Sequence, residues 1–477
     1  MDYASFNQKL NSLKTFPNLD INTIEKFGEI LPGLTGLELY RINPTYFANQ
    51  HNLNQTNVLD ICIHGVKIGL FDFDWNMFCP VCGGISSSHH SIDQITGEKY
   101  LCSQCDKYIE TDLSNYVEVS FNLSPSVKKL EYDPFKNFKS YREYYIANNF
   151  EYPKEILDYI ANSMLVFKAL SADESCTISF ESKPNELYRL TSIDNHALVN
   201  LQMNDKVSEQ SQILNVDILP TRFSPNSLRL SAGKITLAIH NRLNRKTGFT
   251  IFLKKHEIAD KLFQRNPPKI RPFLTGKMLL NNQTFRDLFR MQSLPTDLKV
   301  KVSNVTILFT DLKSSTELYE RKGDIPAYNI VQKHFELLKA ATRDFSGAII
   351  KTIGDAIMAS FSTPTDGVNA AIDMLEKMKL LNQIKDEQEI AIKVGLHSGT
   401  ALAVCANETL DYFGQTVNLA ARVQGLAEGG EICMTTPVYS TQDVQKSLNL
   451  NQYSVEKVSS KLKGISIPTT VYKCKFK

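Results

Sequence analysis

The sequence lacks the features that mark several specialised protein classes. No uninterrupted apolar run approaches the roughly 18 residues that a membrane-spanning helix needs. The N-terminal stretch MDYASFNQKL is polar and has no signal-peptide core. The formal net charge is only +2, so no strong attraction to nucleic acid is expected. We find no internal repeat or low-complexity tract, and we expect a soluble, cytoplasmic protein without a membrane partner.

The composition is that of an ordinary globular protein. Charged residues make up 22% of the chain and apolar residues 42%. A length of 477 residues predicts about three domains. We therefore expect an α+β multidomain protein.

Four of the nine cysteines form two CxxC pairs, Cys79-Pro-Val-Cys82 and Cys102-Ser-Gln-Cys105, with nineteen residues between them. This spacing is typical of a zinc ribbon, which we place at 79–112. Four thiolates around one tetrahedral ion leave no open position, so we expect one structural Zn²⁺. His89 and His90 are expected to be loop residues, and a redox dithiol would leave the second pair unexplained. The other cysteines are expected to be buried free thiols: Cys62, Cys176, Cys405, Cys433 and Cys474.

Residues 1–78 have a helical pattern that ends in a strand. The region resembles a winged helix. It contains a short helix and turn at 43–54, a second helix at 58–68 that ends near Gly69, and an alternating strand at 71–75. The second helix carries one Lys and no Arg, which is poor for phosphate contacts. We favour a small packing module over a nucleic-acid-binding regulator, which is the alternative from another functional class.

Residues 113–257 predict a β-rich regulatory domain built as an antiparallel sheet or sandwich. A helical interruption is expected at about 138–170, and residues 258–300 are expected to be a connector. The alternating segments that predict strands are 116–121, 234–239 and 247–253.

Residues 301–477 predict strands and helices in β-α-β-β-α-β order, which is the ferredoxin-like arrangement. Two predicted strands, 305–310 and 348–353, run directly into Asp311 and into Gly354-Asp355. Two strand ends that each present a carboxylate are what a pair of Mg²⁺ or Mn²⁺ ions needs. The ligands suit both metals.

Asn418 and Arg422 lie four residues apart on a predicted helix, 415–426, so they share a face. An amide beside a guanidinium suits a ribose and a developing phosphorane charge. Lys463 is within reach of a β- or γ-phosphate in this scheme. Each of these residues alone would be an ordinary surface side chain.

In combination, four motifs resemble those of the class III nucleotidyl cyclases over residues 301–477. They are Phe309–Thr316, Lys351–Asp355, Val394–Gly399 and Asp411–Arg422. The upstream half is similar to the zinc-ribbon and β region that precedes some soluble bacterial cyclases. The sequence departs from the family pattern at Ser314, where many relatives have glycine.

The resemblance implies attack of a 3′-hydroxyl on the α-phosphate, which yields a cyclic 3′,5′-monophosphate and pyrophosphate. It also implies a head-to-tail homodimer with two shared sites, since the metal carboxylates come from one subunit and the Asn/Arg groups from the other. The roles it implies are metal binding by Asp311 and Asp355, base recognition by Lys351 and Asp411, ribose orientation by Asn418, transition-state stabilisation by Arg422 and triphosphate binding by Lys463.

The base readers favour ATP as the substrate. Asp411 accepts from the adenine amino group and Lys351 donates to the ring nitrogen, whereas guanine presents the reverse order. An unpaired buried polar group costs about 1–3 kcal/mol, so GTP should be rejected. Cytosine offers the same pattern as adenine, so a pyrimidine cyclase stays open, as does a guanylate cyclase or a degenerate nucleotide-binding scaffold.

Overall fold

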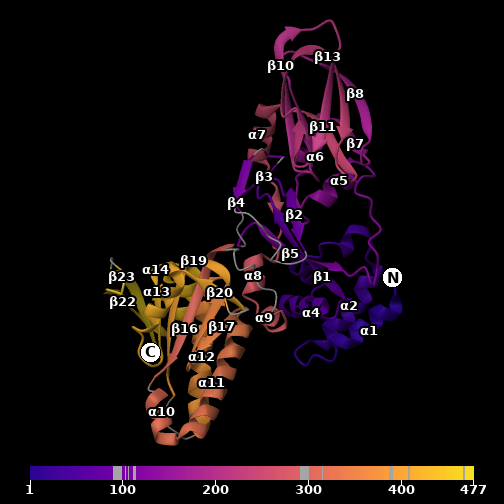
Figure 1. Ribbon diagram of the computed structural model, residues 1–477. Coiled ribbons are helices and arrows are strands. Elements are labelled where there is room, and N and C mark those ends of the chain that lie inside the picture. The colour runs from indigo at the N-terminus through magenta and orange to yellow at the C-terminus, as the bar shows by residue number, and fades with distance from the viewer. Residues whose placement is uncertain are drawn as a thin grey trace. The chain divides into compact units, whose positions relative to one another are not determined.

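The structure is a computed structural model and describes residues 1–89, 99–102, 104–105, 107–110, 114–289, 300–313, 315–385, 390–406, 409–465 and 468–477. The chain forms two compact units (Figure 1). The first comprises Met1–His90, Gly97–Thr111 and Glu118–Leu274, and the second comprises Ser91–Thr96, Asp112–Val117 and Thr275–Lys477. Among the described residues, no helix is both long and apolar enough to cross a membrane.

The first unit begins with short helices that pack through apolar faces. Side-chain caps set several of their starts: Asp20 and Asn54 each accept a hydrogen bond from a backbone N–H in the first turn. Gly69, with φ of +75°, follows the last helix at the predicted place. These elements are α1 (Tyr3–Leu13), α2 (Ile21–Ile30), η1 (Leu31–Gly33), η2 (Gly36–Leu39), α3 (Pro44–Gln50) and α4 (Gln55–Lys67).

The predicted helix–turn–helix–strand order is present, and the assignment as a winged helix stays a prediction. The strand that follows α4 is β1 (Phe71–Phe78), which lies between β2 (Ile85–His89) and β5 (Val117–Leu123) in a three-stranded sheet. Placing strand 116–121 in the middle β domain was therefore wrong. The cause is a long-range pairing that local alternation does not encode. A hairpin of β3 (Lys99–Cys102) and β4 (Lys107–Glu110) carries the second cysteine pair.

Glu118 in β5 is fully buried, and neither carboxylate oxygen has a hydrogen-bond partner among the described residues. Burial raises its pKa to about 7, with Arg41 opposing and Asp74 adding to the shift. A carboxyl whose pKa is higher in the folded than in the unfolded state stabilises the fold at low pH. That contribution is lost as the pH rises through about 7.

We predict that Glu118→Gln flattens the pH dependence of stability. The unfolding free energy of the variant should gain on the order of 2–3 kcal/mol relative to wild type between pH 5 and pH 8, because the charged form is no longer buried. Urea denaturation at several pH values measures this. Parallel pH profiles for the two proteins would contradict it.

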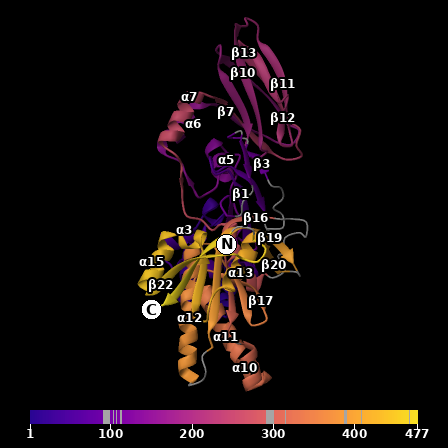
Figure 2. The ribbon, with the colours of Figure 1, turned by 90° about the vertical axis from the view of Figure 1, so that its left-hand side faces the viewer.

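The rest of the first unit is dominated by an eight-stranded sheet in the order β12-β11-β13-β10-β9-β14-β7, with β8 paired to β13. Figure 2 shows β10, β13 and β11 side by side. The strands are β7 (Met164–Leu170), β8 (Ser175–Ser182), β9 (Leu187–Ser192), β10 (Ala197–Val207), β11 (Gln212–Leu219), β12 (Arg222–Ser224), β13 (Ser227–Asn241) and β14 (Thr247–Leu253). Around them lie α5 (Phe138–Tyr145), β6 (Phe150–Glu151), α6 (Lys154–Ser163), α7 (His256–Arg265) and β15 (Lys269–Ile270).

Two expectations for this region need correction. The sheet is mixed rather than antiparallel, because β13 runs parallel to both β10 and β11. Its first part pairs with β10, and after Gly233, with φ of +122°, it pairs with β11 and β8. Glycine tolerates the positive φ at this position, so the two parts of β13 can pair with different strands. The helical interruption also ends at Ser163, and the segment from Met164 is strand β7.

The second unit contains an eight-stranded sheet in the order β17-β18-β16-β19-β21-β23-β22, with β20 paired to β19. The predicted strand-helix-strand-strand-helix-strand order is present from β16 to β19. Its elements are α8 (Gly276–Leu280), α9 (Gln283–Leu288), β16 (Val300–Leu312), α10 (Ser315–Lys322), α11 (Asp324–Asp344), β17 (Ala348–Ile353), β18 (Ala356–Phe361), α12 (Pro364–Lys385), β19 (Ile392–Ala406), β20 (Thr409–Phe413), α13 (Gln415–Gln424), β21 (Glu431–Thr435), α14 (Thr436–Tyr439), α15 (Gln442–Leu450), β22 (Tyr453–Ser460) and β23 (Thr469–Phe476).

Helices cover both faces of this sheet. Helices α11 and α12 lie side by side (Figure 1) and share an apolar core with Val394 and Leu396 of β19. Gly395 points to the opposite face because side chains alternate along a strand. There a Cβ on Gly395 would lie 2.2 Å from the Gln424 backbone nitrogen, so glycine is what lets α13 rest on the sheet.

Candidate active site and cysteine cluster

The two predicted metal carboxylates lie at strand ends. Asp311 is the penultimate residue of β16, and its nearest cation is the Lys393 ammonium, 3.9 Å from Oδ2. Asp355 follows Gly354 in the turn from β17 to β18, where Gly354 has φ of +63°. The Oδ2 atom of Asp355 is buried and accepts no hydrogen bond from the described residues. Ser314, the departure from the family's glycine, lies outside the described residues.

This geometry fits a hard divalent cation. A buried carboxylate oxygen without a donor is costly unless a cation satisfies it. The carboxylates of Asp311 and Asp355 are the oxygen ligands that Mg²⁺ and Mn²⁺ prefer. The chemistry of the donor set is therefore compatible with the metals that the sequence implies.

The predicted base readers are in direct contact. Lys351 Nζ on β17 donates a hydrogen bond to Asp411 Oδ2 on β20 over 2.6 Å. The other carboxylate oxygen accepts from the Tyr412 backbone N–H at 2.7 Å. Lys351 also lies 5.6 Å from the centre of the Phe413 ring. A cation, a carboxylate and an aromatic ring thus meet at one place.

Asn418 and Arg422 share one side of α13. Asn418 is exposed, and the Nη1 atom of Arg422 is buried without a hydrogen-bond partner among the described residues. The guanidinium lies beside Gly464, where an added Cβ would be 3.2 Å from Nη1. Lys463 is the exposed neighbour of that glycine. The loop with Lys463 and the helix with Arg422 are therefore brought together.

The site residues form separate groups within one chain. Among the described residues, no hydrogen bond or ion pair joins Asp311 or Asp355 to Asn418 or Arg422. Lys351 and Asp411 are hydrogen-bonded to each other. Within the described part of one chain, the two groups of the expected site are thus not bonded to each other.

Three polar residues that the sequence did not single out hold the base-reading strands. Arg286 of α9 donates to the Leu410 carbonyl at 2.8 Å. Asn281 accepts from the Tyr412 hydroxyl at 3.1 Å, and Gln283 accepts from the Ile349 N–H at 2.8 Å. Part of the predicted connector therefore supports β17 and β20. The only local signal was a short helical pattern, and the contacts themselves are long-range.

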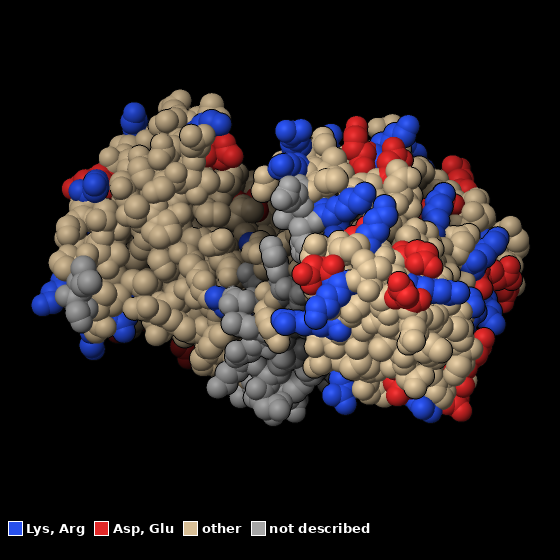
Figure 3. All heavy atoms as spheres, turned by 90° about the horizontal axis from the view of Figure 1, so that it is seen from above, with Lys and Arg blue, Asp and Glu red and all other residues tan. Residues whose placement is uncertain are grey.

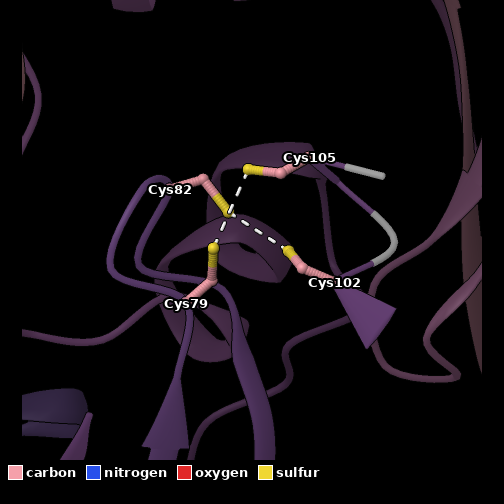
Figure 4. A group of neighbouring side chains, drawn as sticks. All are labelled: Cys79, Cys82, Cys102 and Cys105. Atoms are coloured by element: carbon pink, nitrogen blue, oxygen red, sulfur yellow. Dashed lines mark hydrogen bonds between the residues drawn. The ribbon is translucent and has the colours of Figure 1, made fainter. Parts of the chain in front are cut away.

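The four predicted zinc ligands converge in the first unit (Figure 4). Their Sγ atoms all lie within 4.8 Å of one another. The Cys79–Cys105 sulfurs are 3.8 Å apart and the Cys82–Cys102 sulfurs 3.5 Å. A tetrahedral ion with Zn–S bonds of about 2.3 Å holds its sulfurs about 3.8 Å apart. The cluster therefore has the size that a zinc ion needs.

Backbone hydrogen bonds fix the turn that carries Cys79 and Cys82, which we call the cysteine knuckle. The Cys79 N–H donates to Gly84 O at 2.9 Å, and the Gly83 N–H donates to Cys79 O at 2.7 Å. Gly83 has φ of +62°, as a turn after the first pair requires. His89 is the last residue of strand β2 and pairs with Trp75, so its assignment to a loop was wrong, and His90 lies outside the described residues. The cluster thus has four sulfur ligands and a preformed backbone.

Both parts of the chain match known protein families. Residues 7–287 match the "Family of unknown function (DUF5939)", and residues 299–471 match the "Adenylate and Guanylate cyclase catalytic domain". A relative, the adenylate cyclase of Lachancea kluyveri, is 28% identical over 201 residues, which cover 38% of this chain and 11% of that protein. The chain thus spans only a small part of that relative's length.

Two solved cyclase structures are among the similar proteins, with low TM-scores. The adenylyl cyclase CyaB from P. aeruginosa is 23% identical, with 38% of this chain and 97% of that one covered and a TM-score of 0.34. The guanylate cyclase domain of RhGC from Catenaria anguillulae is 20% identical, with 37% and 98% covered and a TM-score of 0.32. Both adenylate and guanylate cyclases thus occur among the similar proteins. Because the first match covers 281 of its 477 residues, the chain belongs to the DUF5939 family, and it carries an adenylate and guanylate cyclase catalytic domain at residues 299–471.

Proposed function

We propose that this protein is an adenylate cyclase that converts ATP to 3′,5′-cyclic AMP and pyrophosphate. The observation that carries the choice of base is the 2.6 Å contact between Lys351 Nζ and Asp411 Oδ2. Together they offer a donor and an acceptor side by side, which matches the ring nitrogen and amino group of adenine. Guanine has the opposite order and would leave both groups unpaired.

The remaining residues supply the groups that the reaction needs. In the proposed site, Asp311 and Asp355 hold two Mg²⁺ or Mn²⁺ ions, which would activate the 3′-hydroxyl and stabilise charge on the phosphates. Asn418 orients the ribose, and Lys463 binds the triphosphate. As the 3′-oxygen bonds to the α-phosphorus, the bond to the β-phosphate breaks, pyrophosphate leaves and the hydroxyl proton is released. Arg422 stabilises the added charge on the α-phosphate.

We further propose a head-to-tail homodimer with two equivalent sites. Its support is that no hydrogen bond or ion pair joins the two groups among the described residues of one chain. The buried Arg422 Nη1 and Asp355 Oδ2 atoms each lack a partner among the described residues. A second subunit would bring the carboxylates of one chain to the Asn/Arg pair of the other.

The cysteine cluster is proposed to hold one structural Zn²⁺, as the soluble bacterial zinc-ribbon type of cyclase implies. Four sulfur ligands leave no position for substrate. The five-segment boundaries 1–78, 79–112, 113–257, 258–300 and 301–477 remain part of this proposal. We expect the N-terminal half to regulate the cyclase domain.

A nucleic-acid-binding role is not favoured. On the face that Figure 3 shows, outside the grey atoms, basic and acidic side chains are interspersed and no extended basic patch is present. Nucleic-acid binding that depends on phosphate contacts normally needs such a patch.

The direct test incubates the full-length protein with ATP, GTP or CTP and Mn²⁺, and identifies cyclic products by mass spectrometry. We expect cyclic AMP from ATP at least tenfold faster than product from either other nucleotide. The Asp311→Ala protein, purified in the same way, controls for contaminating cyclases. Cyclic CMP or cyclic GMP as the main product would refute the ATP assignment, and no product from any nucleotide would refute cyclase activity.

A further inference from the structure

The first unit contains a cavity of about 550 Å³ that the cyclase chemistry does not use. Its wall comes from residues between 34 and 51, residues between 142 and 152, and Arg271. The volume lies within the range of about 300–1,000 Å³ that is typical of small-molecule sites. The cavity belongs to the region matched by the family of unknown function.

Arginine and tyrosine side chains dominate the polar wall. Three arginines each lie over the ring of a tyrosine that also lines the cavity. The pairs, with the distance from Cζ to the ring centre, are Arg41 and Tyr40 at 4.6 Å, Arg271 and Tyr46 at 4.5 Å, and Arg142 and Tyr152 at 5.8 Å. A guanidinium that stacks on a ring keeps its N–H edges available to an anion.

One of these arginines has no counter-ion. Arg41 pairs with Asp74 over 3.3 Å, and Arg271 pairs with Glu151. Arg142 makes neither a side-chain hydrogen bond nor an ion pair with any described residue, and it lies over the ring of Tyr152. One positive charge in the wall is therefore left for a ligand.

The acidic residues of the wall are engaged elsewhere. Glu38 accepts a hydrogen bond from the Thr35 N–H at 2.9 Å, where it completes a capping box. Glu143 lies 3.8 Å from the Lys139 ammonium on the exposed side of the same helix. Neither carboxylate forms an ion pair with Arg142, so this guanidinium stays available to bind an anion.

One aromatic side chain of the wall, Tyr46, also leaves ring surface for a planar group. Phe47 and His51 of the wall lie 4.7 Å apart, and Tyr46 is 41% exposed. Such rings and guanidinium planes stack well on a nucleobase. Anion recognition and ring stacking thus occur in one cavity.

The cavity is preformed because one wall is bonded to the cysteine knuckle. The Ala147 N–H donates to Gly83 O at 2.7 Å, and the Tyr152 hydroxyl donates to Cys82 O. The Phe150 ring packs so closely on Gly83 that an added Cβ would lie 2.6 Å away. A rigid wall lowers the entropy cost of binding.

We propose that this cavity binds a small anion that carries a planar ring, with the chemistry of a nucleoside monophosphate. Arg142 contacts the phosphate, and the tyrosines flank the ring. This site is distinct from the proposed cyclase site and does not depend on cyclase activity.

Calorimetric titration of the full-length protein with AMP, adenosine and inorganic phosphate tests the proposal. We expect saturable binding of AMP and at least tenfold weaker binding of adenosine and of phosphate. Arg142→Gln should weaken AMP binding at least tenfold, because it removes the guanidinium of the wall that has no counter-ion among the described residues. Lys154→Gln is the control, since Lys154 in α6 is an exposed cation outside the cavity wall, and it should change the affinity less than twofold.

Two further variants keep the result interpretable. Tyr46→Ala removes a half-exposed ring without disturbing the core and should weaken AMP binding three- to tenfold. Asp311→Ala should leave the Arg142-dependent binding unchanged, which separates this site from the cyclase site. The proposal is overturned if AMP shows no saturable binding, if adenosine binds as tightly as AMP, or if Arg142→Gln has the affinity of wild type.

Discussion

A mixture of the Asp311→Ala and Arg422→Ala proteins should recover cyclase activity, although each variant alone should lose at least about a hundredfold. In a heterodimer of the two, one site lacks both groups and the other retains both. Random pairing makes half of the dimers mixed, so the mixture should reach about a quarter of wild-type activity. The measurement is cyclic AMP formation after equilibration at equal concentrations.

The matched control mixes Asp311→Ala with Asp355→Ala. Both residues belong to the same half of the site, so every site in every dimer lacks one metal carboxylate. No recovery is expected. If the first mixture stays as inactive as its parents, or if the control recovers equally, the shared-site proposal is wrong.

Loss of the metal from the cysteine cluster should destabilise the first unit strongly. Structural zinc contributes on the order of 10 kcal/mol of apparent binding free energy in small zinc domains. We expect about one zinc ion per chain by elemental analysis and none in Cys82→Ser. The first thermal transition of Cys82→Ser should fall by at least about 10 °C, since 1 kcal/mol corresponds to about 2–4 °C for a domain of 150–250 residues.

Cys176→Ser is the control for this experiment. Cys176 is a half-buried thiol on β8 and lies outside the cluster. Its replacement should keep the zinc content and change the transition little. A wild-type protein that contains no metal, or a Cys82→Ser protein as stable as wild type, would refute a structural zinc.

The sequence predicted the strands, helix faces and turns that depend on residues close together in the chain. The strand runs before Asp311 and Gly354-Asp355 are present, because apolar β-branched residues and a turn signal act locally. The helical face of α11, with Ala327 and Leu338, is buried as its periodicity predicts. The CxxC spacing likewise anticipated the convergence of four sulfurs.

Short or long-range elements were missed. Strand β20 has only five residues, and β19 runs without interruption over Ile392–Ala406. The parallel pairing of β13 was not foreseen, since strand neighbours are chosen across large sequence separations. For the same reason, nothing local marked Arg286 or Asn281 as supports of the base-reading strands.

The sequence by itself determined the chemical groups: two strand-end carboxylates, a Lys/Asp pair, an Asn/Arg helix face and four thiols. These follow from residue type and local periodicity, which act over a few residues. Only the tertiary structure decided which groups meet. It joined Lys351 to Asp411, and it left Arg422 Nη1 and Asp355 Oδ2 buried without a hydrogen-bond partner among the described residues. It also gathered arginines and tyrosines from distant segments around one cavity, because packing, not local propensity, sets such contacts.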